Sequence, residues 1–435
     1  MIYGVAFNYF NEAIGLAVAM PARINPYLCA QCKGSRRLCG RARCPIVERL
    51  AAQLSVAGKL TGTHLFGASP PSILVGEYGY PKIKLGPLVP PVEDKRLAAL
   101  YDNPEQWYGK SIEEIIKLRS NLIRANFTVS VKEARRASKF LERTQELALS
   151  SIPVDTEVHF AKPVKPRLMF DGVVSPVGPS GVVKDLSVVE NPVVPRKVDA
   201  LVADYDAPAV VAVRELYEAG IPQHYITRLL TVGLLGRKID RRLVPTRWGI
   251  TAVDSMIGDY LLERVRDYPE IDEILLYSNS YLDNHYYVLL MPGSYAFEMV
   301  EIWLPRSVWV RDASQSYIVE NFELYDGKWQ KADVDGGYKA MRLVAIEFLS
   351  KIRRQAMVFA IREIGPGYYA PLGVWNVREG MRHAFDRKPL KFDSIDEAIA
   401  ELARRVKTPF EQWWRHAYLP KMFKLQRRLS EFIRG

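Results

Sequence analysis

Cysteine is scarce in this sequence: the chain has 435 residues and four cysteines. All four lie between positions 29 and 44, so no disulfide can staple the long remainder of the chain. If all four bind a metal ion, none of them is left to act as a catalytic nucleophile. The scarcity therefore argues against a disulfide-based fold and against a cysteine-dependent enzyme.

Long apolar runs are also missing. No segment reaches about eighteen uncharged apolar residues, which is the length that a membrane-spanning helix needs. Met1–Phe10 lacks the basic and apolar pattern of a secretory signal. We therefore expect a cytoplasmic, nucleoid-associated protein without a membrane partner.

Several enzyme motifs are absent as well. The sequence has no G-x-x-x-x-G-K-[ST] loop, no G-x-S-x-G elbow and no H-E-x-x-H motif. Histidines are few and scattered, which predicts separate structural roles for them: His64, His159, His224, His285, His383 and His416. These absences argue against a P-loop ATPase and leave open whether the protein is an enzyme.

The four cysteines are the most specific feature that is present. Their spacing is C-x2-C-x6-C-x4-C, formed by Cys29, Cys32, Cys39 and Cys44. Four thiolates close a tetrahedral site, so we interpret the segment as a structural Zn2+ knuckle. An iron–sulfur cluster is the main alternative, because Cys44-Pro45 resembles the end of some cluster motifs, and disulfides are less favoured.

Positive charge is concentrated in a few segments of the chain. The formal net charge of +11 favours a polyanionic partner. Basic runs surround the cysteines and cover 237–247, 353–388 and 404–434. Such cations contact phosphates and neighbouring aromatic rings stack on bases, although a single basic run is more often a solvated face. The candidate nucleic-acid-binding residues are Arg36, Arg37, Arg41, Arg43, Arg237, Lys238, Arg241, Arg247 and Trp248.

Two sets of carboxylates have a spacing that suits divalent ions. Asp204 and Asp206 are two positions apart, and Asp254, Asp259 and Glu263 lie on an expected helix. If the five carboxylates converge, they can hold Mg2+ or Mn2+ for phosphodiester cleavage. Caps, turns and solvated faces explain the same spacing more simply.

The C-terminal segment contains the pattern Gln426-x-x-Leu429-x-x-Phe432-Ile433. On a short helical turn, the three apolar side chains would fill a hydrophobic pocket and Gln426 would bond at its rim. The pattern resembles the PCNA-interacting peptide of replication and repair proteins, except that Ile433 stands in place of a second aromatic. A helix packed on its own core gives the same spacing.

Mixed helical and strand patterns predict an α+β fold class. We expect an N-terminal region with the zinc knuckle (1–160), a central mixed β-rich region with helices (161–330), a C-terminal helical region (331–420) and the clamp-binding tail (421–435). The expected helices are 46–60, 111–125, 131–148, 207–218, 221–235, 248–266, 336–362 and 394–406. The expected strands are 73–80, the hairpin 271–281 and 285–292, and 297–310, and the stretch 162–211 is expected to be β-rich.

Together these features resemble the Nre family of archaeal DNA repair proteins. The cysteines and the tail carry the resemblance at the two ends, and Gly67–Ser72, Val75–Pro81 and Pro245–Thr251 carry it between them. It covers almost the whole chain and implies repair of DNA damage together with PCNA, but no particular reaction. We therefore expect a DNA-binding repair factor recruited by the clamp. The alternatives are a metal-dependent repair nuclease and, less favoured, an RNA-binding or RNA-processing protein.

Overall fold

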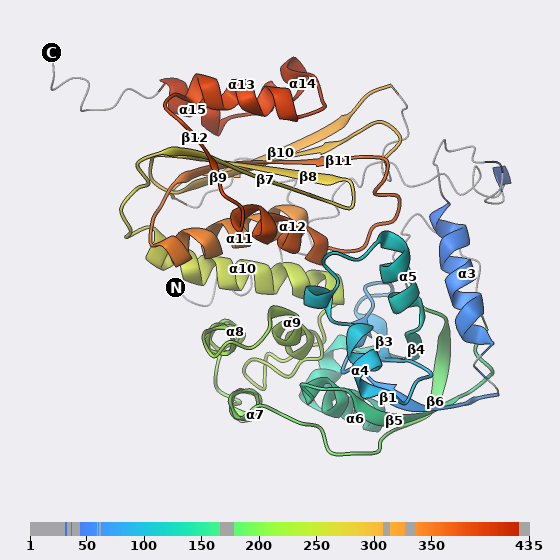
Figure 1. The fold of residues 1–435 in the computed structure, drawn as a ribbon. Helices are drawn as coiled ribbons and strands as arrows, with labels where there is room; N and C mark the ends of the chain where they lie inside the picture. The colour runs from blue at the N-terminus through green and yellow to red at the C-terminus, as the bar shows by residue number, and fades with distance from the viewer. Residues whose placement is uncertain are drawn as a thin grey trace, which may run out of the picture. The chain divides into compact units, whose positions relative to one another are not determined.

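The computed structural model describes residues 31–32, 36, 44–58, 60, 62–165, 178–307, 314–326 and 336–425 (Figure 1). The chain forms two compact units, Cys44–Ile257 and Gly258–Gly435, divided inside the helix α10 (Thr246–Val265). This division differs from the boundaries expected near residues 160 and 330. Strands from both sides of each of those positions pair within one sheet, so neither position separates two cores.

The first unit is built on a six-stranded sheet in the order β1-β5-β6-β4-β3-β2. Neighbouring strands are antiparallel except β4 and β6, which are parallel. Along β1 and β5 the residues alternate, so Leu65 and Val158 are buried in the core while His64 and His159 face solvent. The strands are β1 His64–Ser69, β2 Ile73–Val75, β3 Lys82–Val89, β4 Ile123–Ser130, β5 Val154–Phe160 and β6 Ser180–Val188.

Helices and short turns complete the first unit. The helix α5 begins with the predicted capping box, in which Ser111 Oγ accepts from the Glu114 N–H and the Glu114 carboxylate accepts from the Ser111 N–H. The helices are α3 Pro45–Ala57, α4 Lys95–Leu100, α5 Ile112–Ser120, α6 Lys139–Leu149, α7 Arg196–Ala203, α8 Ala209–Glu218 and α9 Gln223–Thr231, with 3-10 turns η1 Pro104–Gln106 and η2 Val131–Arg135.

The second unit contains another six-stranded sheet, in the order β10-β9-β11-β8-β7-β12. The central strand β11 is parallel to β9 and antiparallel to β8. Helices α11 and α12 cover one face and α13, α14 and α15 cover the other, so every residue of β9 and β11 is buried (Figure 1). The elements are β7 Ile274–Tyr281, β8 Asn284–Met291, β9 Ala296–Trp303, β10 Tyr317–Glu323, α11 Gly336–Ile352, β11 Met357–Ile364, α12 Trp375–Phe385, β12 Leu390–Phe392, α13 Ile395–Arg405, α14 Phe410–Trp414 and α15 Leu419–Leu425.

The α+β fold class is confirmed, and many expected elements form. The helices α3, α8, α9, α10 and α13 lie close to the expected ranges. The expected hairpin forms as β7 and β8, with its turn at Leu282 and Asp283, whose φ angles are 51° and 54°. Within the described ranges, no helix combines the length and the apolar character that crossing a membrane requires.

Three expectations about secondary structure were wrong. Met357–Ile364, expected as the end of a long helix, is the buried strand β11. Ile123–Ser130 is the strand β4, although its first three residues were expected to end the helix 111–125 and no strand was expected there. The stretch 162–211 holds one strand among its described residues, β6, and then α7 and the start of α8. A strand buried on both faces shows no polar alternation, so its apolar run cannot be told from a helix by period.

Candidate nucleic-acid interface

Two segments that are distant in the sequence meet beside β2, the edge strand of the first sheet. One is the loop Gly76–Pro81 between β2 and β3, and the other is the first turn of α10. The backbone N–H of Val75 donates to Thr246 Oγ1 at 2.9 Å. Arg247 Nη1 lies 2.9 Å from Glu77 Oε1. These contacts join the loop to the start of the helix.

An aromatic pair lies at the same place. The ring centroids of Tyr80 and Trp248 are 5.2 Å apart, and the rings are tilted by 48°. Tyr80 is 38% exposed and Trp248 is partly buried. Tyr78, two residues before Tyr80, is almost fully exposed. The site therefore presents aromatic surface to solvent, and unpaired bases stack on such surface.

The backbone of the loop is held in one shape. The Gly76 N–H donates to the Lys84 carbonyl and the Lys82 N–H donates to the Gly79 carbonyl, both at 2.9 Å. Gly79 has a φ of 85°, and a Cβ there would lie 2.7 Å from the Lys82 carbonyl oxygen, so only glycine suits the turn. Beneath the loop, Arg124 Nη2 donates to the Lys84 carbonyl at 2.7 Å, and burial lowers the pKa of Arg124.

Exposed cations lie on the segments that adjoin the loop and the start of α10. We define the basic strip as Lys82, Lys84, Lys132, Arg136, Arg242 and Arg247. Backbone hydrogen bonds place their segments side by side: the Val131 N–H donates to the Pro81 carbonyl at 3.0 Å, and the Leu243 N–H donates to the Val131 carbonyl at 2.9 Å. Arg247 pairs with Glu77, and within the described ranges no ion pair joins the other five cations to an acid. The strip therefore carries excess positive charge.

Comparison with known families decides where the chain belongs. Residues 38–310 match the family described as archaeal Nre, N-terminal, and residues 323–432 match archaeal Nre, C-terminal. The chain belongs to the archaeal Nre family. No solved structure matches this Nre chain.

Three DNA repair proteins are similar to this Nre chain over most of its length. DNA repair protein NreA of Archaeoglobus fulgidus is 39% identical, over 88% of this chain and 95% of the relative. DNA repair protein NreB of the same organism is 36% identical, over 93% of this chain and 100% of the relative. DNA repair protein NreA of Haloferax volcanii is 34% identical, over 78% of this chain and 83% of the relative.

In this Nre chain, the other predicted cations of the 237–247 run contact neighbouring carbonyl, carboxylate or aromatic groups. Arg241 is buried, and its guanidinium donates to two backbone carbonyls at 2.8 Å. Arg237 pairs with Asp240 at 2.5 Å, and the Lys238 ammonium lies over the ring of Tyr205. Of the predicted run, Arg247 and Trp248 reach the site beside β2, while Arg241 has a structural role.

The five candidate catalytic acids are Asp204, Asp206, Asp254, Asp259 and Glu263. Asp204 Oδ1 accepts from two backbone N–H groups in the turn that follows it. Asp254 is buried and accepts from the Gln223 side chain. Asp259 pairs with Arg342 at 2.9 Å. Among the residues that the structure describes, the His/Cys/Asp/Glu group with ligand atoms close enough to share a metal includes none of these five acids.

Three sets of predicted residues fall partly or wholly outside the described residues. Of the four cysteines, Cys32 and Cys44 are inside and Cys29 and Cys39 are outside. Arg36 is exposed, and the neighbouring candidates Arg37, Arg41 and Arg43 lie outside. The whole clamp-binding pattern also lies outside: Gln426, Leu429, Phe432 and Ile433.

Sequence reasoning missed Tyr80 and most of the basic strip. Lys82 and Lys84 do carry a signal, because they alternate with the buried Ile83 and Leu85 and so point away from the core. No local signal relates Lys132 or Arg242 to them, since that proximity depends on backbone pairing between distant segments.

Proposed function

We propose that this Nre protein is a DNA repair factor that binds DNA through the basic strip and the Tyr80–Trp248 pair. The names of its relatives, which it matches over most of their length, support the repair role. The observation that carries DNA binding is an exposed aromatic pair beside a strip of exposed cations, five of which have no acidic partner within the described ranges.

The two parts of the site suit different parts of a DNA strand. Lysine and arginine neutralise phosphates, and this contribution weakens steeply as salt rises. Stacking of a base on an aromatic ring contributes about 1–3 kcal/mol and tolerates any base. A base can reach the rings only where it is unpaired. The proposal therefore predicts binding that is tolerant of sequence, sensitive to salt and stronger for single strands than for duplexes.

The test measures binding of fluorescent single-stranded and duplex oligonucleotides at several salt concentrations. The double variant Tyr80→Ala/Trp248→Ala should bind single strands about tenfold more weakly or worse, because the stacking surface is removed. Tyr317→Ala is the matched control, since Tyr317 has the same exposed fraction of 38% in the second unit. Its affinity should equal that of the unaltered protein.

The cations are tested in the same assay. Lys82→Gln/Lys84→Gln should weaken binding to both forms of DNA and flatten the salt dependence, with a log–log slope reduced by about one for each phosphate that is no longer neutralised. Lys351→Gln, which changes an exposed lysine at the end of α11, is the control. Unchanged affinity in both sets of variants would refute DNA binding at this site.

We propose that Cys29, Cys32, Cys39 and Cys44 hold a structural Zn2+, because four thiolates at this spacing suit tetrahedral ligation. We also propose that Gln426, Leu429, Phe432 and Ile433 dock on the sliding clamp PCNA. The proposal does not extend to a nuclease, since Asp204, Asp254 and Asp259 have local partners.

A further inference from the structure

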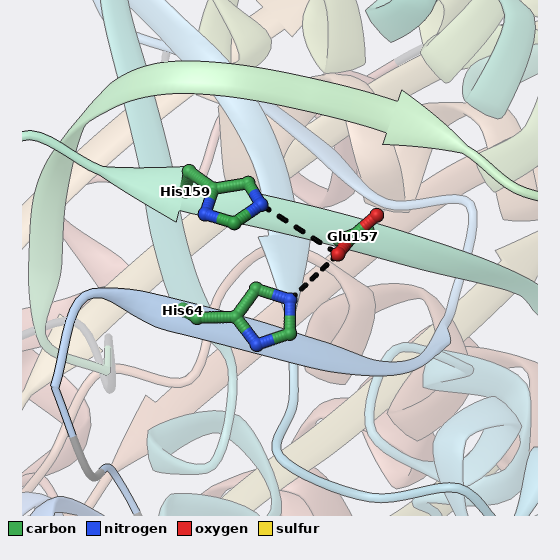
Figure 2. Close-up of side chains that lie close together, drawn as sticks. All are labelled: His64, Glu157 and His159. Carbon is green, nitrogen blue, oxygen red and sulfur yellow. Dashed lines mark hydrogen bonds and ion pairs between the residues drawn. The ribbon is translucent and has the colours of Figure 1, made fainter.

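The first sheet brings together two histidines and a glutamate on its solvent-facing side. His64 begins β1, and it lies directly opposite His159 in the antiparallel pairing of β1 with β5. Glu157 is two residues before His159 on β5, so both side chains leave the strand on the same face. Figure 2 shows the two imidazole rings next to each other, both directed toward the Glu157 carboxylate, and their centroids are 4.6 Å apart.

The distances within this group suit a shared ligand. Glu157 Oε1 lies 2.8 Å from His64 Nε2 and 3.5 Å from His159 Nε2. One ligand atom from each of the three residues lies within 4.8 Å of the other two. Nitrogen and oxygen ligands bound to zinc at about 2.0–2.1 Å are separated by about 3.3 Å in a tetrahedral site. Small side-chain adjustments therefore place the three atoms around one ion.

The strands beneath the group are fixed by the core. Leu65 and Val158, which alternate with the three polar residues, are buried in the core cluster of the first unit. The group is therefore held on two paired strands rather than on a loop, and such support favours a preformed site. The side chains of His64, Glu157 and His159 are each about half exposed. Further ligands can reach the ion from solvent.

We propose that His64, Glu157 and His159 bind a divalent transition-metal ion of the zinc class. Two imidazoles and one carboxylate are a ligand set that zinc adopts where a further position is left to water, whereas Mg2+ and Ca2+ prefer oxygen ligands. The open position suits water or a phosphate oxygen. The sequence predicts separate structural roles for the histidines, whereas the structure brings the rings of His64 and His159 together, with centroids 4.6 Å apart.

The neighbouring acid Asp185 has another partner and is not needed as a ligand. Asp185 lies opposite His159 on β6, and it pairs with Lys139 at 3.3 Å.

The competing explanation is a metal-free cluster in which Glu157 pairs with either imidazole. The two explanations differ in one measurable property, which is the number of metal ions that the intact protein binds.

The experiment is equilibrium dialysis of the full chain against Zn2+, followed by elemental analysis. The unaltered protein should hold one more Zn2+ per chain than His64→Gln or His159→Gln. The matched control is His416→Gln, because His416 lies 2.7 Å from Glu320 and so forms a histidine–glutamate contact outside the cluster. The control should keep the full content. The exposed substitutions His64→Gln and His159→Gln should leave the circular dichroism spectrum and the unfolding midpoint in EDTA unchanged.

A second measurement separates this site from the cysteines. One Zn2+ per chain is first added to the metal-free protein to fill the thiolate site, and Co2+ is added afterwards. The Co2+ should give a weak visible spectrum without thiolate charge-transfer absorption, and this spectrum should be missing in His64→Gln and His159→Gln. Equal Zn2+ content in the unaltered protein and both variants, with the same cobalt spectrum, would leave only the metal-free cluster. The cysteines contribute equally to all the proteins compared, so they cannot mimic the predicted difference.

Discussion

Glu298 has a carboxyl group whose surroundings favour its protonated, neutral form. It is fully buried on β9 and accepts from the backbone N–H groups of Tyr418 and Leu419 at 2.7 and 2.6 Å. Burial raises the pKa of Glu298 to about 8, although the two N–H groups favour the ionised form. The residue is therefore protonated in the folded chain at pH values where the unfolded chain is ionised.

This raised pKa predicts how stability depends on pH. The contribution of Glu298 is fully present below its unfolded pKa of about 4.3 and is lost as the pH rises towards 8, with a slope of about 1.4 kcal/mol per pH unit. Glu298→Gln stays neutral, so its free energy of unfolding should fall less steeply over this range. The absolute stability of the variant should be lower, because the NH2 of the introduced glutamine side chain cannot accept a hydrogen bond and would face one of the two backbone N–H donors.

Urea unfolding at several pH values between about 5 and 8 measures the two slopes. Glu411→Gln is the control, because Glu411 is exposed in α14 and its replacement should leave the slope unchanged. If Glu298→Gln and the unaltered protein lose stability in parallel, Glu298 is ionised in the fold and the predicted effect of burial is refuted.

At the scale of elements, Arg342 ties several segments of the second unit together. On α11, its Nε donates to Glu323 of β10 at 2.7 Å, and its Nη1 lies 2.9 Å from Asp259 of α10. The Tyr295 hydroxyl, just before β9, donates to the same Glu323 oxygen at 2.7 Å. Arg342 and Glu323 are both buried, whereas Asp259 is partly exposed.

Arg342→Met should lower the free energy of unfolding by about 3–5 kcal/mol, because it leaves the Glu323 carboxylate buried without its cation. Asp259→Asn should cost about 1 kcal/mol or less, because that partner is partly exposed. The double variant Arg342→Met/Glu323→Leu should recover much of the loss. Urea unfolding measures all three, and an Arg342→Met cost no larger than that of Asp259→Asn would contradict this account.

The elements that the sequence predicts correctly are those with one buried face and one exposed face. In α13, Ala398 and Leu402 are buried, and Ser394 caps the first turn by accepting from the Glu397 N–H, so period and cap agree. The central strand β11 has no exposed face, and the residues between it and α11 include no glycine or proline that would mark the end of a helix, so the pattern predicts a longer helix. Local pattern fails where an element is surrounded on both sides.

At the scale of the whole molecule, the candidate sites depend on contacts that no local pattern contains. Arg247 and Trp248 are recognisable in the sequence as a cation and a ring near a helix start. Their partner Tyr80 becomes visible only when β2 and β3 bring the loop beside α10. His64 and His159 likewise meet through strand register alone. The chemical character of each residue can be predicted from the sequence, but which residues share a site depends on how the strands and helices are arranged.

The proposed function also separates two tasks along the chain, DNA binding in the first unit and clamp recruitment at the C-terminus. Deleting residues 426–435 should abolish binding to PCNA and leave DNA affinity and the unfolding midpoint unchanged. Leu429→Ala/Phe432→Ala should act in the same way, because these side chains would fill the clamp pocket. Leu425→Ala is the matched control, since Leu425 is largely exposed and lies just before the pattern.

Calorimetric titration with PCNA and DNA-binding assays on the same preparations check both tasks. Met422 and Phe423 of α15 pack against the core of the second unit, and the shortened chain keeps both. If the shortened chain instead unfolds, the apolar spacing of the tail belongs to a helix packed on its own core. If it still binds the clamp, recruitment uses another surface.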